Sequence, residues 1–310
     1  MSSTRRTTGD SSISSRSRIG TGRTTVIRAR TVSGRRTGVS DPANWRNNSK
    51  LVKIANGAYG AVYYHRDPVF AGYVLKQSIK ENTCREWNVE YQKLTAVRQR
   101  LQQHLPGMLL DEYVSIVFHE EYWMNKTAQR NSCNTLMRRV YNHVLPESAL
   151  PIHAKFQIES LNHKDASRGF DVGSKQLKDK LGVMPYHVHH LGRLIAAIHF
   201  VGMNDAWDTE VLVGKTKDAV VWKLFVIDFD LTNELNDQMK PGDIVSRLGQ
   251  SLTQSYYPKP GMRWYDEFKG GYLMLADTCP PLGNMHPAQL ARKAIAHAEG
   301  LHSQFPDGLF

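Results

Sequence analysis

The sequence predicts an α+β fold, with a β-rich first half that holds one main helix and a mostly helical second half. Short apolar runs around a glycine turn predict a hairpin over 51–63 and a third strand over 72–79. Large apolar residues recur at spacings of three and four over 83–104, which is typical of a helix. Further helices are predicted over 187–200, 241–255 and 287–302.

Four short strands complete the predicted elements. They lie at 113–119, 135–141, 211–213 and 221–227. Order is expected to begin near residue 49, so we divide the ordered chain into a first lobe, residues 49–142, and a second lobe, residues 143–310.

Residues 1–48 are predicted to form a disordered tail rich in Arg, Ser and Thr. Residues 1–40 hold 17 Ser or Thr and few large apolar side chains, too few to offset the entropy of ordering the segment. Besides a solvated tail without a fixed role, three roles stay open. The tail could bind an acidic partner such as nucleic acid or lipid, accept phosphate, or target the chain to mitochondria.

Composition narrows the class of protein. The net charge of +11 comes mostly from residues 1–41, which hold nine arginines against two acidic residues. No apolar run reaches the roughly 18 residues that suggest a membrane span. Three widely spaced cysteines predict free thiols in a reducing compartment. We therefore expect an intracellular protein, cytoplasmic or nuclear, without a membrane span.

The turn of the predicted hairpin is the first candidate site. Ala55, Gly57 and Gly60 are small residues that let the backbone close over phosphate groups, with Tyr59 near the tip and Val62 placed to pack on a base. This pattern resembles the glycine-rich loop of protein kinases, with Ala55 in place of the first glycine. A glycine hairpin without a ligand has the same pattern, so the motif alone decides nothing.

A lysine on the third predicted strand is the second feature. Lys76 lies in an apolar strand, where an unpaired charge is costly, so it needs an anionic partner. The next helix offers Glu90 and Glu86, one turn apart on the same face; we favour Glu90 and keep Glu86 as the alternative. Lys76 resembles the kinase lysine that contacts the α- and β-phosphates.

Three acidic residues follow the apolar helix and precede a short strand. Asp205 and Glu210 have the separation of the kinase catalytic Asp and its metal-binding Asn, and Asp208 lies between them. The kinase His-Arg pair is replaced here by Met203 and Asn204, and Glu210 replaces the Asn. Glutamate oxygen is also a ligand for Mg²⁺.

An aspartate at the end of the following strand is the fourth feature. Asp228, Phe229 and Asp230 resemble the kinase D-F-G motif, with Asp230 in place of glycine. In kinases the first Asp of this motif holds Mg²⁺. A strand that runs into a turn has the same local pattern.

Taken in order, the four motifs resemble the protein-kinase-like superfamily. More narrowly, they resemble an uncharacterised fungal family of kinase-like domains with D-x-x-D-x-E and D-F-D motifs, found here at 205–210 and 228–230. The family's Y-Y-P-R-P segment stands here as Y-Y-P-K-P at 256–260. The resemblance covers roughly residues 50–275 and implies a two-lobed kinase-like fold.

The resemblance also implies ATP and Mg²⁺ as cofactors of a phosphotransferase whose substrate is unknown. Lys76 and Glu90 would orient the phosphates, and Asp205 would act as the base. Asp228 would hold Mg²⁺ with Glu210 or Asp208. Because several kinase residues are replaced, a pseudokinase that binds nucleotide or scaffolds a partner without turnover stays open. A third hypothesis is nucleic-acid binding through the basic tail.

Four histidines, His187, His189, His190 and His199, lie on or beside the predicted apolar helix. A helical metal site needs ligand spacings such as i and i+4 together with a third partner. We therefore expect most of these histidines to be solvated or hydrogen-bonded.

Overall fold

The computed structural model describes residues 50–56, 60–78, 84–126, 131–141, 152–159, 164–165, 169–216, 221–281 and 286–304. Contacts divide the chain into residues 1–36 and 37–310, and every described residue belongs to the second unit. The predicted tail, 1–48, lies outside the described residues, as do Gly57 and Tyr59 of the predicted glycine-rich loop. The described part is a mixed α+β structure with two sheets and seven α-helices.

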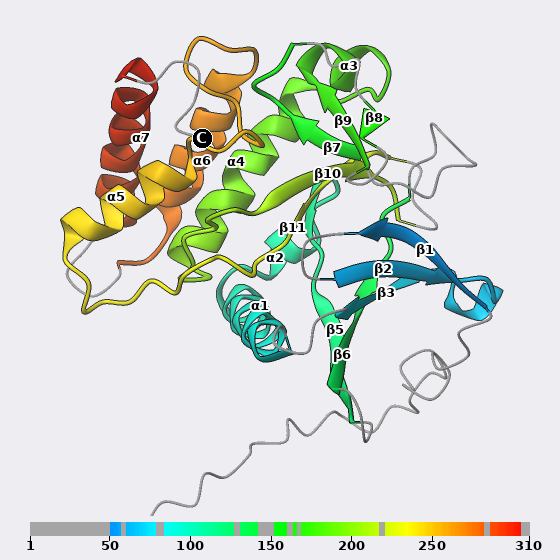
Figure 1. The fold of residues 1–310 in the computed structure, drawn as a ribbon. Coiled ribbons are helices and arrows are strands. Elements are labelled where there is room, and N and C mark those ends of the chain that lie inside the picture. Colours follow the sequence, from blue (N-terminus) through cyan, green and yellow to red (C-terminus); the bar gives the residue numbers. More distant parts are fainter. Residues whose placement is uncertain are drawn as a thin grey trace, which may run out of the picture. The chain divides into compact units, whose positions relative to one another are not determined.

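The first sheet, sheet A, has five antiparallel strands in the order β1-β2-β3-β6-β5 (Figure 1). They are β1 (Leu51–Asn56), β2 (Gly60–His65), β3 (Tyr73–Ser78), β5 (His119–Lys126) and β6 (Asn131–Arg138). A short 3-10 helix, η3 (Pro68–Phe70), connects β2 to β3. The predicted hairpin and third strand are confirmed. The predicted strand 135–141 begins earlier, at Asn131, and β5 was not predicted because its sequence, HEEYWMNK, carries too few apolar residues to signal a strand.

The second sheet, sheet B, is mixed and has six strands in the order β4-β11-β10-β7-β9-β8. They are β4 (Val114–Ile116), β7 (Ile152–Lys155), β8 (Lys164–Asp165), β9 (Gly169–Gly173), β10 (Glu210–Gly214) and β11 (Lys223–Ile227). Strand β4 belongs to the predicted first lobe, yet it pairs in parallel with β11. The boundary at residue 142 therefore does not separate the two sheets. The mostly helical second half also supplies five strands of a sheet, of which β7, β8 and β9 were not predicted because they lack the run of consecutive apolar residues that β10 and β11 carry.

Helix α4 (Pro185–Phe200) carries much of the core of the second half. The other helices of this half are α3 (Ser174–Asp179), α5 (Pro241–Ser251), α6 (Tyr265–Thr278) and α7 (Pro287–Gln304). Helix α4 packs against α6, which in turn contacts α7, and α7 contacts α5. A Cβ on Gly192 of α4 would lie 2.1 Å from the carbonyl oxygen of Phe268, and a Cβ on Gly271 of α6 would lie 1.9 Å from that of His189. Glycine thus lets the backbones of α4 and α6 touch. The sequence did not predict α6, because Gly270 and Gly271 lower the helix propensity of that segment.

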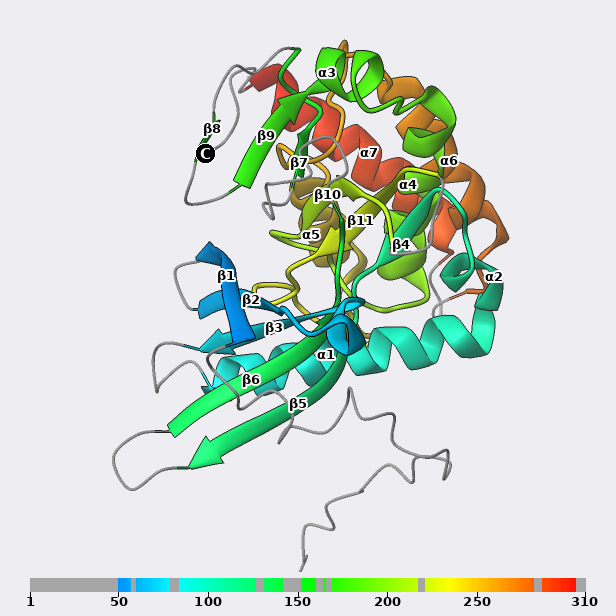
Figure 2. The same cartoon turned by 90° about the vertical axis from the view of Figure 1, so that its right-hand side faces the viewer.

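The long helix α1 (Cys84–His104) connects the two sheets, and a single-turn helix, α2 (Pro106–Leu109), follows it. Figure 2 shows α1 running beside β5 and β6 of sheet A, which it contacts. On its other side, Lys93 donates to the carbonyl oxygen of Asp230 at 3.2 Å and to that of Thr232. Two turns later, Arg100 donates to the carbonyl oxygen of Gly202 at 2.8 Å. Helix α1 therefore fixes sheet A relative to the loops around β10 and β11.

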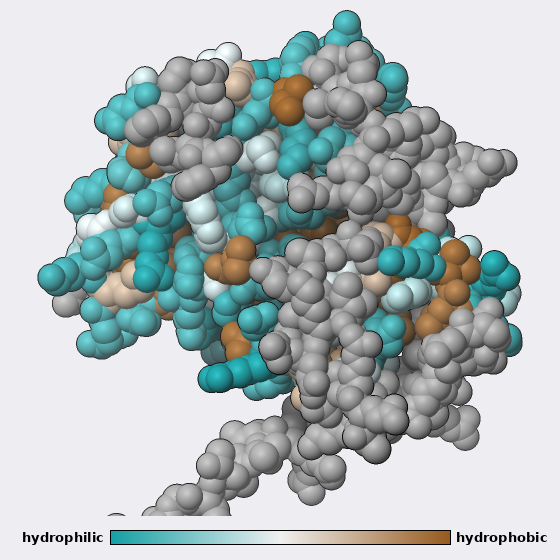
Figure 3. Space-filling view, in the orientation of Figure 1, coloured by the Kyte–Doolittle hydropathy of each residue, from teal (hydrophilic) through white to brown (hydrophobic). Residues whose placement is uncertain are grey.

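Hydrophilic side chains cover most of the described surface on the face drawn in Figure 3, with small separate apolar patches between them. None of the helices in the described part of the chain has the length and apolar composition needed to cross a lipid bilayer.

Candidate functional site

The ammonium group of Lys76 is the centre of the candidate site. Its Nζ lies 3.5 Å from Oε2 of Glu90 on α1 and 3.3 Å from Oδ1 of Asp228 after β11. Burial alone would lower the pKa of Lys76, but the charges of Asp228 and Glu90 raise it well above its ordinary value. The partner preferred from the sequence, Glu90, is the one observed, whereas Glu86 is exposed.

Glu90 is almost fully buried, at 1% exposure, and has three neighbours. Besides Lys76, Nε2 of His119 lies 3.4 Å from its Oε1, and the backbone N–H of Phe229 donates to the same oxygen at 3.4 Å. Burial would raise the pKa of Glu90, but Lys76 and His119 hold it well below its ordinary value. The carboxylate therefore stays ionised and joins α1 to the segment after β11. His119 ends the strand predicted over 113–119 and begins β5 in the structure, and no sequence signal assigned it to the site.

The predicted glycine-rich hairpin forms one wall beside Lys76. Val62 pairs with Lys76 across β2 and β3 and with Ala55 across β1 and β2. A Cβ on Gly60 would lie 2.5 Å from Cζ2 of Trp87 on α1, so the indole ring packs directly on this glycine. The same ring faces the Lys76 ammonium group, 5.0 Å from its centroid. The sequence analysis placed Gly60 in the loop but did not single out Trp87.

An apolar floor lies between the two sheets next to this wall. It consists of Val117, Met137, Val140, Leu212, Phe225 and Ile227. Met137 pairs with Val74, two residues before Lys76, and Ile227 directly precedes Asp228. The floor therefore adjoins the charged centre from both sheets.

Four carboxylates gather around the end of β11. Burial and the charge of Asp228 together raise the pKa of Glu210 to about 7 and that of Asp230 to about 6. Partial burial and the charge of Asp228 also raise the pKa of Asp208, although this residue remains largely exposed. The predicted metal residues Asp228, Glu210 and Asp208 thus lie close enough to repel one another.

Asp205, the predicted base, has a different environment. It is 2% exposed, and its carboxylate accepts hydrogen bonds from Trp207 N at 3.1 Å, Asn233 N at 2.8 Å and Asn233 Nδ2 at 2.9 Å. Its contacts therefore join the 203–208 loop to the segment after Asp230. Asn233 was not anticipated, because an exposed Asn in a loop carries no sequence signal.

Unusual backbone conformations concentrate at these acidic residues. Five non-glycine residues in the described ranges have positive φ. Four of them belong to the site, Met203 (55°), Ala206 (50°), Asp208 (61°) and Asp228 (62°), and the fifth is Trp264. Such conformations are costly for residues with a Cβ and persist where the surroundings enforce them, often at functional sites.

Glu210 has two neighbours that the sequence did not assign to the site. The hydroxyl of Tyr256 donates to its Oε1 at 3.0 Å, and Nδ1 of His153 on β7 lies 3.3 Å from its Oε2. Tyr256 had a signal, since it begins the Y-Y-P-K-P segment. His153 had none, because β7 was not predicted.

The arrangement of these carboxylates limits which metal ion they fit. Within the described ranges, no group of three or more His, Cys, Asp or Glu side chains is arranged to hold one. Mg²⁺ differs from metals with all-protein sites, because it usually takes one or two carboxylates and completes its shell with water and substrate phosphates. The repelling pair of Asp228 with Glu210 or Asp208 fits that smaller requirement.

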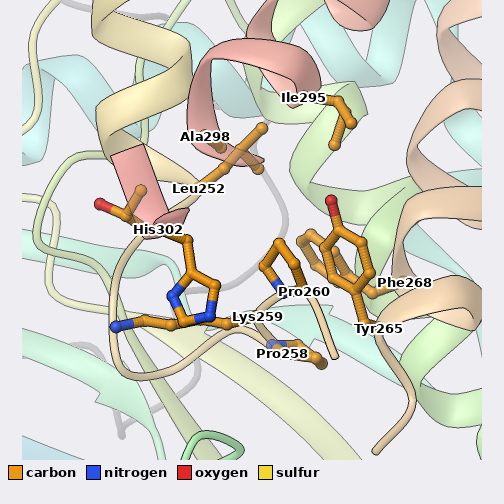
Figure 4. Close-up of a pocket in the computed structure, with 10 residues that line it drawn as sticks. Leu252, Pro258, Lys259, Pro260, Tyr265, Phe268, Ile295, Ala298 and His302 are labelled. Atoms are coloured by element: carbon orange, nitrogen blue, oxygen red, sulfur yellow. The ribbon is translucent and has the colours of Figure 1, made fainter. Parts of the chain in front are cut away.

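Two hollows lie away from these carboxylates. One is a cavity of about 10 Å³ under Pro258–Pro260, where Figure 4 shows Tyr265 and Phe268 on one side and Lys259 with His302 on the other. Its volume holds at most one water molecule. The other, of about 450 Å³, lies between the end of α1 and the loop after Asn233, and Arg100 and Glu234 pair across its rim.

No family model matches this chain, and no curated protein sequence matches it.

Proposed function

We propose that this chain is a phosphotransferase of protein-kinase-like, two-lobed fold that uses ATP and Mg²⁺ and acts on a substrate still to be identified. The observation that carries the proposal is the position of Lys76, 3.3 Å from Asp228 and 3.5 Å from Glu90. Three separate elements, β3, α1 and the end of β11, meet at this one charge. Phosphoryl transfer depends on such positioning, because a lysine must be held where it contacts phosphate oxygens.

The surroundings of Lys76 support a nucleotide as the ligand. The apolar floor suits the flat, weakly polar surface of a base, and it adjoins Lys76 through both sheets. The side chain of Val62 lies on the same face of sheet A as that of Lys76, because the two residues pair directly across β2 and β3. Apolar side chains with a few convergent polar groups are the usual lining of a small-molecule site.

Each acidic residue has a role in this proposal. Glu90 orients Lys76 toward the site of the phosphates, and Asp228 with Glu210 or Asp208 would hold Mg²⁺. The metal, when bound, neutralises charge on the phosphate oxygens. Asp205 keeps the loop in place through Trp207 and Asn233. Asp208, which is exposed in the same loop, is then the carboxylate that an acceptor hydroxyl can reach.

Thermal unfolding of the full chain with ATP, with and without Mg²⁺, tests the proposal. Ligand about 100-fold above its Kd stabilises a protein by about 2.7 kcal/mol, a shift that such a titration resolves. We expect stabilisation by Mg²⁺ and ATP together, and its loss in Lys76→Met. Lys269→Met is the matched control, because Lys269 pairs with Glu299 on α6 and α7, away from the site. A wild-type chain that shows no response to ATP and Mg²⁺ would sink the proposal.

One observation favours a second candidate, a pseudokinase that binds nucleotide without turnover. Asp205 has the place of the aspartate that acts as the base in kinases. Its carboxylate is buried and already accepts three hydrogen bonds. Release of ADP from ATP, measured on the wild-type chain with Mg²⁺, separates the two candidates. Stabilisation by ATP with no turnover favours the pseudokinase.

A further inference from the structure

The Y-Y-P-K-P segment and the residues before it contact the loop that carries Asp208 and Glu210. Gln254 Nε2 donates to the carbonyl oxygen of Ala206 at 3.2 Å. The hydroxyl of Tyr257 lies 2.7 Å from Oγ1 of Thr209, and that of Tyr256 donates to Oε1 of Glu210 at 3.0 Å. One short segment thus bonds to the start, middle and end of the 206–210 loop.

Tyr257 anchors the loop to the helical core. Its side chain is fully buried and its ring stacks on Phe268 of α6, with 5.4 Å between centroids. The hydroxyl of Thr209 donates to the carbonyl oxygen of Ala206 at 3.0 Å, so the hydroxyl of Tyr257 must donate to Thr209. A hydroxyl on a rigid, stacked ring has little freedom to move, so it fixes the position of Thr209.

Tyr256 holds the side chain of Glu210. Its hydroxyl engages Oε1 while His153 on β7 engages Oε2, so both carboxylate oxygens have a partner. The ring of Tyr256 is held in turn, because Nζ of Lys155 lies 3.6 Å from its centroid and donates to Oγ of Ser255 at 3.2 Å. The direction in which Glu210 points is therefore set by residues outside its own loop.

The loop needs this external support because its backbone is unfavourable on its own. Ala206 and Asp208 have φ values of 50° and 61°, which side chains with a Cβ rarely adopt. Conformations of this kind persist only when neighbouring structure imposes them. In this loop the segment 254–257 imposes the conformation from one side, and Asn233 holds the preceding residue, Asp205, from the other.

We propose that Tyr256 and Tyr257 are positioning residues that hold the 206–210 loop so that Asp208 and Glu210 face the Asp228 end of the site. This inference rests on the proposed function for its consequence, which is the binding of Mg²⁺ with nucleotide. Residues that orient a metal ligand commonly change metal affinity by 10- to 100-fold when they are replaced.

The first test compares Tyr256→Phe with Tyr265→Phe by calorimetric titration of ATP at several Mg²⁺ concentrations. Both variants lose one tyrosine hydroxyl bonded to a glutamate, but Tyr265 bonds to Glu299 at 2.8 Å on the far helices. We expect Tyr256→Phe to weaken Mg²⁺-dependent ATP binding about tenfold and to leave Mg²⁺-free ATP binding unchanged. Tyr265→Phe should match the wild type. Equal Mg²⁺ dependence in all three proteins would overturn the proposal for Tyr256.

The second test needs no ligand and therefore separates this inference from the proposed function. Hydrogen exchange of the 205–210 backbone should speed up in Tyr257→Phe, while α4 and α6 keep their protection. Tyr265→Phe should leave the loop unchanged. If a wild-type chain binds no nucleotide, the proposed function fails and this measurement alone decides the positioning role. Unchanged exchange of the loop in Tyr257→Phe would overturn it.

Discussion

Lys76 illustrates how much of this protein depends on single charged residues. Its side chain is only 18% exposed, and its charge would be unstable there without the two carboxylates that approach it. Glu90 in turn depends on Lys76, His119 and the N–H of Phe229. The residues form one network, so the loss of any member leaves another buried group without a partner.

The network predicts that Glu90→Gln is strongly destabilising. The substitution removes the buried negative charge but leaves Lys76 and His119 in place, and breaking a buried pair in this way costs roughly 3–5 kcal/mol. Urea unfolding at neutral pH measures the loss. Glu86→Gln is the control, because Glu86 is exposed on the same helix and should change stability by about 0.5 kcal/mol or less. Similar unfolding of the two variants would show that Glu90 contributes little to the fold.

At the scale of elements, helices with a clear apolar period and strands with an apolar run could be predicted, and elements whose apolar residues are interrupted by polar residues or glycine could not. The spacing of apolar residues in α1 gave a helix over 83–104, and the observed helix is Cys84–His104. Polar residues interrupt the apolar ones in β7 (IHAK) and β9 (GFDVG), whereas β10 (EVLVG) and β11 (KLFVI) carry three or four apolar residues in a row. Helix α6 was missed because its two adjacent glycines indicate a turn. The reason for Gly271 is tertiary, since α4 approaches it too closely for a side chain.

That reason predicts opposite effects for two neighbouring substitutions in α6. In Gly271→Ala the new Cβ would lie 1.9 Å from the carbonyl oxygen of His189, so the helices must separate, at a cost of roughly 1–3 kcal/mol or more. In Gly270→Ala the nearest atom is 3.9 Å away, so the higher helix propensity of alanine should stabilise the chain by up to about 1 kcal/mol. Thermal unfolding compares the two. A destabilised Gly270→Ala, or a tolerated Gly271→Ala, would contradict the packing of α4 on α6.

At the scale of the whole molecule, local motifs indicated which residues belong to the candidate site, but they did not predict the contacts and distances between those residues. The pairing of Lys76 with Glu90 followed from helix spacing and the cost of an unpaired charge. Its second partner, Asp228, is 152 residues away, and the order of the motifs along the chain does not predict the distance between two such residues. The environment of Asp205 could not be predicted, because it depends on Asn233, an ordinary loop residue. Tyr256 and His153 were likewise brought to Glu210 by long-range packing alone.

Helices α4 and α6 and the 203–208 loop meet at His199, whose protonation makes the stability of the fold depend on pH. Its Nε2 contacts the carbonyl oxygen of Asp205 at 3.1 Å, so Nε2 carries the proton and Nδ1 accepts from the hydroxyl of Tyr272 at 2.8 Å. Burial lowers the pKa of His199 from 6.5 to about 3, although the bond to Asp205 opposes the shift. The imidazole is therefore neutral in the folded protein, as expected for a hydrogen-bonded core histidine.

This shift predicts that the whole molecule loses stability as the pH falls. Below pH 6.5 the unfolded chain protonates His199, while the folded chain keeps it neutral down to a pH of about 3. The unfolded state thus binds more protons between these values, and the free energy of unfolding should fall by up to about 1.4 kcal/mol per pH unit from this residue.

Urea unfolding between pH 7 and pH 4 measures the dependence of the unfolding free energy on pH for the wild type, for His199→Gln and for His104→Gln. His104 is exposed at the end of α1. We expect His199→Gln to be less stable at pH 7, because the imidazole bonds are lost, but to show the shallower slope. His104→Gln should retain the wild-type slope. Parallel slopes for all three proteins would mean that His199 is not held neutral in the core, and that its link between α4, α6 and the loop is weaker than its contacts imply.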